Sequence, residues 1–238
     1  MPGHHYAERQ LLTPDRLTGR SVLVAGATGG LGSAIAENLA ARGARLTLVA
    51  RNAERLAALG VPGHKVALDL RDPQACEAAI GAAHSHAGRL DVVVNAVGVV
   101  AFGMVTELSS DVMEELFMTN TFVPIMLFRA ALGSMTDGGV IVNISGVIAE
   151  QGVAGMAAYG ASKAAVRSFD EALGREARRR KIRVIDARPP HTETGLATRP
   201  IAGQAPKMPL GLAPAGVAAI ICEAIAGDAV DLPSGVFG

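Results

Sequence analysis

The feature that most constrains the fold is a short apolar run that breaks into glycines and then into a helical pattern. Residues 21–25 read Ser-Val-Leu-Val-Ala, and Gly26, Gly30 and Gly32 follow with the spacing G-x-x-x-G-x-G. This spacing permits a tight turn, close approach of the backbone to a pyrophosphate, and a helix N-terminus that points at the anion. A second apolar run at 45–50 completes a βαβ unit of about 30 residues. The alternative is a glycine turn that serves only compact packing.

Short apolar runs and helical patterns alternate along the rest of the chain. Strands are predicted at 21–25, 45–50, 64–68, 90–94, 140–145, 182–187 and, more weakly, 229–231, and helices at 31–42, 53–59, 73–86, 109–135, 157–180 and 214–226. Such alternation is typical of a parallel sheet covered on both faces. The sequence therefore predicts an α/β fold, a Rossmann-type doubly wound parallel sheet of about seven strands with helices on both faces. It would form a single domain over 18–238, after an N-terminal tail at 1–17.

Composition and charge limit the classes of partner. Half of the 238 residues are apolar but only 3% are aromatic, so the core must be built from Ala, Val, Leu and Ile. The 22 basic and 22 acidic residues balance, so no global field favours nucleic acid or an anionic membrane. The basic residues between Arg175 and Lys181 close a predicted helix, where cations complement the helix dipole. We therefore expect neither nucleic acid nor a membrane as a partner.

The cysteines and the N-terminus bear on the cellular compartment. Cys76 and Cys222 are far apart and have no metal-ligand or Cys-x-x-Cys spacing, so neither a disulfide framework nor a metal site is predicted. Residues 1–9 lack the charged-then-apolar pattern of a signal peptide, and no run reaches the ~18 apolar residues of a membrane span. We expect a reducing, cytoplasmic environment.

A tyrosine and a lysine carry the strongest chemical signal. Tyr159 and Lys163 are four residues apart in a helix that is predicted to start near Ala157, so both side chains lie on one face. A free phenol has a pKa of about 10, and a nearby cation favours its ionised form. Lys163 is therefore predicted to lower the pKa of Tyr159 and make it a usable acid or base. An isolated pair of this kind is more often an exposed Tyr and Lys on an amphipathic helix.

Together, the glycine turn and the Tyr-Lys pair resemble the short-chain dehydrogenase/reductase family in its classical single-domain form, over about residues 18–231. Further motifs of that family match in chain order: Asp69 after the third strand, Asn95-Ala96-Val97-Gly98 after the fourth, Asn120 in a later helix, and Pro189 to Thr194 after the sixth. Two positions depart from the family pattern. Ala96 replaces the usual second Asn, and Pro190 replaces the usual Gly.

The resemblance implies reversible hydride transfer between a nicotinamide cofactor and a carbonyl or secondary alcohol. Tyr159 would give or take the proton of the substrate oxygen, and Lys163 would hold the nicotinamide ribose. Asn120 would hold a water that links Lys163 to solvent; the alternative is a side chain that bonds to its own helix backbone. The segment 191–213, rich in Gly, Pro and Thr, would be the substrate-binding lid.

The resemblance also places a set of residues along the cofactor. Asp69 would sit by the adenine, Asn95 and Gly98 along the adenosine ribose and the sheet crevice, and Thr194 near the nicotinamide amide or the phosphates. The full cofactor-binding set is Gly26, Thr28, Gly29, Gly30, Leu31, Gly32, Arg51, Asp69, Leu70, Asn95, Ala96, Gly98, Tyr159, Lys163, Pro189, Thr192 and Thr194. Relatives associate through the helices that hold Asn120 and Tyr159, so a homotetramer or homodimer is expected.

The fifth predicted strand departs most seriously from the family pattern. The family ends this strand with a catalytic Ser thirteen residues before the Tyr, and counting back from Tyr159 reaches Gly146. Ser145 is one position early, and one step along an ideal strand turns a side chain to the opposite face. Three outcomes are open. A bulge at Gly146 re-aims Ser145 into the site as a catalytic residue, another group such as His191 holds the carbonyl, or the protein binds cofactor without turnover.

The end of the second predicted strand bears on cofactor choice. NAD-preferring relatives carry an acidic side chain there, which accepts the ribose hydroxyls and repels a 2′-phosphate. Ala50 occupies that position, and the guanidinium of Arg51 beside it can pair with a phosphate through two hydrogen bonds. NADP(H) is therefore predicted over NAD(H). In the alternative, Arg51 pairs with Glu54 on the surface.

The predicted function is thus an NADP(H)-dependent oxidoreductase that acts on a small carbonyl or alcohol substrate. The alternative is a cofactor-binding, catalytically impaired protein of the same family that acts as a sensor or scaffold. Gly146 is the sole argument for this alternative, and the retention of Tyr159, Lys163 and Asn120 argues against it.

Overall fold

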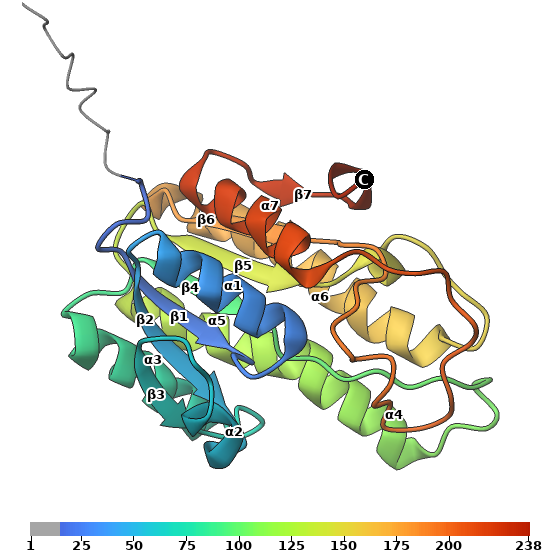
Figure 1. Ribbon diagram of the computed structural model, residues 1–238. Coiled ribbons are helices and arrows are strands. Elements are labelled where there is room, and N and C mark those ends of the chain that lie inside the picture. The colour runs from blue at the N-terminus through green and yellow to red at the C-terminus, as the bar shows by residue number, and fades with distance from the viewer. Residues whose placement is uncertain (1–14) are drawn as a thin grey trace, which may run out of the picture.

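Seven strands form one parallel sheet in the order β3-β2-β1-β4-β5-β6-β7 (Figure 1). The computed structural model describes residues 15–238, and the predictions for residues 1–14 lie outside the described residues. The strands are β1 (Ser21–Ala25), β2 (Arg45–Ala50), β3 (His64–Ala67), β4 (Val92–Asn95), β5 (Val140–Ile144), β6 (Arg183–Ala187) and β7 (Asp231–Leu232). The order reverses direction between β1 and β4, which creates a crevice at the carboxyl ends of these strands.

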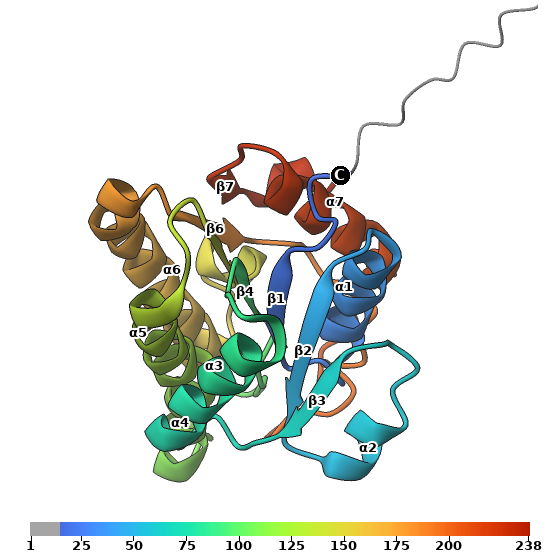
Figure 2. The ribbon, with the colours of Figure 1, turned by 90° about the vertical axis from the view of Figure 1, so that its left-hand side faces the viewer.

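Helices cover both faces of this sheet. They are α1 (Gly30–Ala41), α2 (Ala53–Ala57), α3 (Pro73–Ala87), α4 (Ser110–Phe117), α5 (Val123–Ser134), α6 (Ala157–Glu176) and α7 (Pro214–Ala226). Figure 2 shows α1 and α7 on one face and α3 to α6 on the other. Side chains of each strand alternate between the two cores: Val22 and Val24 pack with α1 and α7, whereas Leu23 and Ala25 pack with α3 and α5. The prediction of a doubly wound α/β fold is confirmed.

The helix predicted at 109–135 is continuous but not uniform. A π-helical turn, Met118–Phe122, joins α4 to α5. The stretch Ser110–Ser134 is long and apolar enough to cross a membrane, with a mean hydropathy of 1.4, although no run of 18 apolar residues occurs in the sequence. Half of the 18-residue window that meets this test is buried within the fold. Contacts of α5 with α3 and α6 account for this burial, so the stretch is built as a core helix.

The packed part of the chain begins before residue 18. Leu17 is fully buried in the core on the α1 and α7 side. Asp15 accepts a hydrogen bond from Arg42 Nε at 2.7 Å. Residues 15–17 therefore belong to the packed body rather than to a free tail.

Candidate active site

A cavity of about 680 Å³ lies at the carboxyl ends of β1, β4 and β5, where ligands bind in open α/β sheets. Its walls are the glycine turn before α1, the end of β2, the segment after β4, α6 and the loop 191–213. Most of the predicted site residues line it: Gly26, Thr28, Gly29, Gly30, Leu31, Arg51, Asp69, Leu70, Ala96, Gly98, Ser145, Tyr159, Lys163, Pro189, Thr192 and Thr194. Gly32, Asn95 and Asn120 lie behind these walls.

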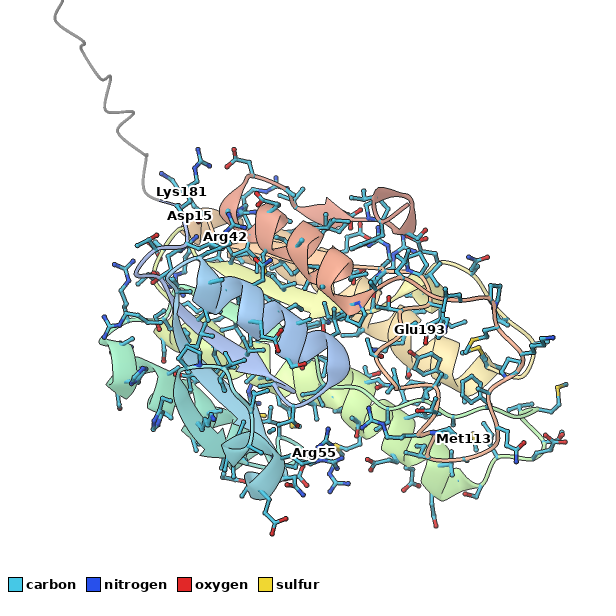
Figure 3. All side chains as sticks on the ribbon, viewed as in Figure 1. Asp15, Arg42, Arg55, Met113, Lys181 and Glu193 are labelled. Atoms are coloured by element: carbon cyan, nitrogen blue, oxygen red, sulfur yellow. The ribbon has the colours of Figure 1, made fainter. Side chains whose placement is uncertain are left out.

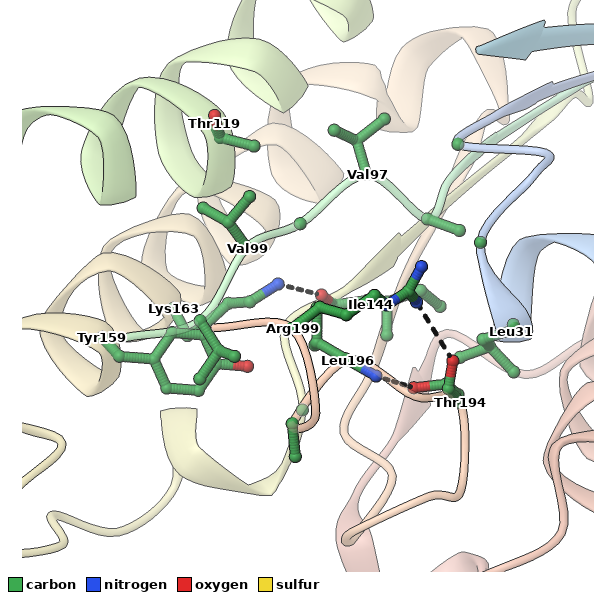
Figure 4. Close-up of a pocket in the computed structure, with 18 of the residues that line it drawn as sticks. Leu31, Val97, Val99, Thr119, Ile144, Tyr159, Lys163, Thr194, Leu196 and Arg199 are labelled. Atoms are coloured by element: carbon green, nitrogen blue, oxygen red, sulfur yellow. Dashed lines mark hydrogen bonds between the residues drawn. The ribbon is translucent and has the colours of Figure 1, made fainter. Parts of the chain in front are cut away.

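Tyr159 and Lys163 face the cavity from α6 (Figure 4). The Tyr159 side chain packs among apolar residues and the residue is 9% exposed. Lys163 Nζ donates a hydrogen bond to the carbonyl oxygen of Ile144 at 2.8 Å, at the end of β5. This contact holds the ammonium at the carboxyl end of β5, and Lys163 lies one helical turn after Tyr159 in α6.

Burial dominates the pKa of both groups. It raises the pKa of Tyr159 from 10.0 to about 12 and lowers the pKa of Lys163 from 10.5 to about 8. The charges of Asp186 and Asp170 oppose the shift at Lys163, because each raises its pKa. The prediction that Lys163 lowers the pKa of Tyr159 is wrong for this arrangement, because burial raises that pKa. Near neutral pH, the phenol of Tyr159 is therefore in its neutral form.

Asn120 lies in the π-helical turn between α4 and α5, and single π turns of this kind are frequent at functional sites. Its Oδ1 accepts a hydrogen bond from Val99 N at 2.9 Å, and its Nδ2 donates to Val99 O and to Ser162 Oγ, each at 3.0 Å. The side chain thus ties the segment after β4 to α6. Bonding to its own helix, the alternative raised from the sequence, is wrong. A water held by Asn120 for Lys163 stays a prediction.

The structure contains a bulge at the end of β5, but it does not re-aim Ser145. Ser145 N and Gly146 N both donate to Ala187 O, at 3.1 and 3.2 Å, so two residues directly after β5 oppose one residue of β6. The Ser145 hydroxyl donates to Asp186 and is 1% exposed. Ser145 keeps the strand alternation and points to the α6 side, as Asn143 does. The expectation of a catalytic Ser145 is therefore corrected: its hydroxyl is committed to a carboxylate outside the cavity.

His191 keeps a geometric basis as a replacement donor, because its side chain lines the cavity. His191 Nε2 lies 3.3 Å from Glu193 Oε1, and the same oxygen accepts a hydrogen bond from Gly211 N at 2.8 Å. The imidazole is therefore tethered within the loop 191–213. Its role at the carbonyl stays a prediction.

The glycine turn fits a pyrophosphate. Gly26 has φ +78°, and a Cβ on it would lie 2.7 Å from the carbonyl carbon of Ala96. Gly29 caps α1 without a side-chain hydrogen bond, so the first N–H groups of the helix face the cavity without an internal partner. The unpaired N–H groups at the start of α1, next to glycines that have no side chain to block approach, are suitable hydrogen-bond donors for an anionic diphosphate.

Cationic side chains surround the other end of the cavity. Arg51 lines it and forms no ion pair with Glu54, so the surface pair considered from the sequence is not formed. Arg55, on α2, donates to Thr28 O at 2.9 Å and reaches the glycine turn (Figure 3). Asp69 binds Arg71 through its carboxylate, and this hydrogen bond lowers the pKa of Asp69.

Sequence reasoning missed three of the cavity's cations, Arg55, Arg71 and Arg199. Arg55 follows Arg51 at helical spacing, which was the available signal. Arg199 lies in the loop 191–213 and lines the cavity, with its guanidinium beside Thr194 (Figure 4). Nothing in its local sequence distinguishes it from an exposed lid arginine.

Comparisons with known proteins agree with this geometry. Residues 20–204 match the family described as short chain dehydrogenase. The chain is 32% identical over 186 residues to the 3-oxoacyl-acyl-carrier-protein reductase FabG of Vibrio cholerae, covering 76% of each chain. Among solved structures, a short chain dehydrogenase from Burkholderia cenocepacia in complex with NADP superposes with a TM-score of 0.80 at 28% identity, covering 92% of this chain and 97% of that one.

A dehydrogenase/reductase from Sinorhizobium meliloti gives the same TM-score of 0.80 at 29% identity, covering 91% of this chain and 94% of that chain. Fold, cavity and sequence thus agree over most of the chain. This protein belongs to the short-chain dehydrogenase family: it is an oxidoreductase that binds a nicotinamide cofactor and acts on small molecules.

Proposed function

We propose that this protein is an NADP(H)-dependent reductase of small carbonyl compounds, which also oxidises the corresponding secondary alcohols. The observation that carries the proposal is the placement of Tyr159 and Lys163 in the same cavity as Arg51 and Arg55. The first pair supplies proton transfer at an oxygen, and the second supplies cations for a phosphate.

A nicotinamide dinucleotide, when bound, supplies or accepts the hydride. Tyr159 Oη gives its proton to the oxygen of a carbonyl substrate, or takes it from an alcohol. Because burial raises the pKa of Tyr159 to about 12, the neutral phenol, which is the form that can donate a proton, dominates at neutral pH. Lys163, whose pKa burial lowers to about 8, remains mostly cationic at neutral pH and stabilises the phenolate that proton transfer leaves behind.

The proposed preference for NADP(H) rests on Arg51 and Arg55, which both line the cavity. Arg51 carries no internal ion pair among residues 15–238, and its charge contributes to the lowered pKa of Asp69, which places it near that carboxylate. A 2′-phosphate would give Arg51 a partner. Arg55 has a second role, because it also holds the carbonyl of Thr28 in the glycine turn.

A second function, cofactor binding without turnover, is favoured by one observation. Gly146 offers no hydroxyl, and that of Ser145 is bonded to Asp186. A reductase working here must therefore hold its substrate oxygen with Tyr159 and another group, for which His191 is available. The two functions differ in turnover and not in cofactor binding.

The deciding experiment follows NADPH oxidation by absorbance against a panel of aliphatic, aromatic and cyclic ketones. We expect turnover that falls at least about 100-fold in Tyr159→Phe, because one positioned proton donor is lost, while NADPH binding persists. Tight NADPH binding with no turnover on any ketone of the panel would favour the second function. Equal turnover in wild type and variant would remove Tyr159 from the mechanism.

Cofactor preference has its own test. Arg51→Gln is expected to raise the KM for NADPH about 10-fold or more, the value of one charge-assisted contact, and to leave the KM for NADH unchanged. Arg55→Gln should weaken both cofactors, because it also releases the glycine turn. Arg178→Gln, a change on the exposed end of the long helix, is the matched control. An equal loss for NADH in Arg51→Gln would contradict contact with the 2′-phosphate.

A further inference from the structure

Arg199 is the one lid cation that reaches into the cavity among the described residues. The loop 191–213 is fixed at two places: Thr192 bridges Leu212, and Ala202 bridges Ala101. Both lid cations, Arg199 and Lys207, are exposed. Arg199 lies between the two fixed points and lines the cavity, whereas Lys207 does not line it. The lid thus presents a single charged side chain inward.

The guanidinium of Arg199 is held beside the start of α1. Its Nε donates to Gly195 O at 2.9 Å, and its Nη2 lies 3.5 Å from Thr194 O (Figure 4). Thr194 O in turn lies 2.5 Å from the position that a Cβ on Gly30 would occupy, so Thr194 touches the first residue of α1. Arg199 is therefore positioned at the helix N-terminus through Thr194.

Two positive groups meet at this point without an internal counter-charge. The N-terminus of α1 carries the positive end of its dipole, and Arg199 forms no ion pair with any residue in 15–238. The nearest lid carboxylate, Glu193, is engaged by His191 and Gly211 N. The charged side chains that line the cavity are Arg51, Arg55, Arg71, Lys163, Arg199 and Asp69, and the single carboxylate among them is bonded to Arg71. The arrangement favours an anion between lid and helix.

We propose that Arg199 binds the pyrophosphate of the dinucleotide cofactor from the lid side, opposite the N-terminus of α1. Its free N–H groups donate charge-assisted hydrogen bonds to the phosphate oxygens. Cofactor and lid are thereby coupled: the bound diphosphate holds the segment around Arg199 closed, and the closed lid slows release of the cofactor. The inference rests on cofactor binding by this family and not on the preference for a 2′-phosphate.

The test separates pyrophosphate from 2′-phosphate with two fragments. ADP-ribose carries the pyrophosphate without the 2′-phosphate, and adenosine 2′-monophosphate carries the 2′-phosphate without the pyrophosphate. By calorimetry, Arg199→Gln is expected to weaken ADP-ribose about 10- to 100-fold, as one to two charge-assisted bonds are lost, and to leave adenosine 2′-monophosphate unchanged. Arg51→Gln is expected to weaken adenosine 2′-monophosphate and to leave ADP-ribose unchanged. Lys207→Gln, a lid cation outside the cavity, should alter neither.

A second readout follows the lid itself. Trypsin cleaves after Lys207, and NADP+ is expected to slow this cleavage in wild type but much less in Arg199→Gln. Unchanged ADP-ribose affinity in Arg199→Gln would overturn the proposal, and a raised KM for the ketone alone would assign the guanidinium to substrate instead. If wild type bound no ADP-ribose, both the inference and dinucleotide binding would fail. If Arg51→Gln bound adenosine 2′-monophosphate as tightly as wild type while Arg199→Gln lost affinity for ADP-ribose, the proposed preference for NADP(H) would fail. The role of Arg199 would then stand.

Discussion

At the scale of single residues, one backbone step separates Ser145 from the position that faces the cavity. Ser145 follows the alternation of β5 and donates to Asp186, whereas Gly146 takes φ +83° in the bulge and lines the cavity. A Cβ on Gly146 would meet only Pro189 O, at 3.8 Å. Space for a side chain is therefore present, but the backbone conformation is one that non-glycine residues rarely adopt.

Ser145→Ala is expected to affect stability more than catalysis. Removing the hydroxyl takes a hydrogen bond from the buried carboxylate of Asp186, which should lower the free energy of unfolding by about 1.5–3 kcal/mol. The value of kcat at neutral pH should change less than about threefold, because transition-state contacts rather than remote packing set kcat. Urea unfolding and ketone reduction check the two effects. A large loss of kcat with unchanged stability would return Ser145 to the catalytic site.

Spacing alone could predict Tyr159 and Lys163, because helical periodicity places residues four apart on one face. It could not predict the pKa of either group, since a pKa depends on how much protein covers the group. The roles of Arg55 and Arg199 could not be predicted from the sequence either, because they depend on contacts that form only on folding. Arg55 bonds to Thr28 in the glycine turn, and Arg199 bonds to Thr194, which itself contacts Gly30. Only the folded chain creates these contacts with the start of α1.

At the scale of elements, the loop 191–213 was recognised by its Gly and Pro content, but its docking was not. Phe102 N donates to Ala202 O at 2.9 Å, and Ile201 N donates to Val100 O at 2.9 Å. These bonds join the lid to the segment after β4 like a short extra strand. The sequence carries no alternating apolar pattern there, so this pairing could not be predicted. The π-helical turn at Met118–Phe122 could not be predicted from the sequence either. One extra residue in a single turn barely changes the period of the apolar pattern in a long helix.

Gly203→Ala is expected to undock the lid. A Cβ on Gly203 would lie 1.9 Å from the carbonyl oxygen of Phe102, so the docked backbone must move, at a cost of about 1–3 kcal/mol for overpacking. We expect faster trypsin cleavage after Lys207 and a raised KM for cofactor.

The matched control for Gly203→Ala is Gly88→Ala. Gly88 has a similar φ, +74° against +69°, but open space around it. Both variants carry the same left-handed backbone strain, and only one carries the clash. Equal trypsin sensitivity in the two variants would show that a general loss of stability, and not the clash with Phe102, exposes the lid.

At the scale of the whole molecule, the layered fold followed from the alternation of strand and helix patterns. The charged residues buried inside the fold could not be predicted from that pattern. Lys163, Asp170, Asp186 and Arg188 are all buried, at 6%, 3%, 6% and 3% exposure. Arg188 pairs with Asp186, Asp231 and Glu150, and these pairs join β6 to β7 and to the segment after β5. Sequence patterns treat charged residues as surface, so a cluster of this kind could be found only in the folded chain.

One consequence of this buried charge is that Lys163 lowers the stability of the fold it serves. Its pKa falls from 10.5 to about 8 on folding, so the unfolded chain binds more protons between these values and stability rises with pH across that window. Below pH 8 the full cost is present, at about 1.4 kcal/mol for each pKa unit. Tyr159 acts oppositely at higher pH, since its pKa rises from 10.0 to about 12 and stability is lost as pH rises through that range.

Lys163→Met should therefore abolish turnover and yet stabilise the protein by about 2–3 kcal/mol at neutral pH, after allowing for the lost bond to Ile144 O. Urea unfolding of wild type and variant from pH 6 to 10 measures this difference, which should shrink as pH rises above 8. Lys207→Met, at an exposed lid position, should leave stability unchanged. If Lys163→Met were instead less stable at neutral pH, attraction to Asp186 and Asp170 would outweigh the cost of burying the ammonium. The lysine would then be a structural charge as much as a catalytic one.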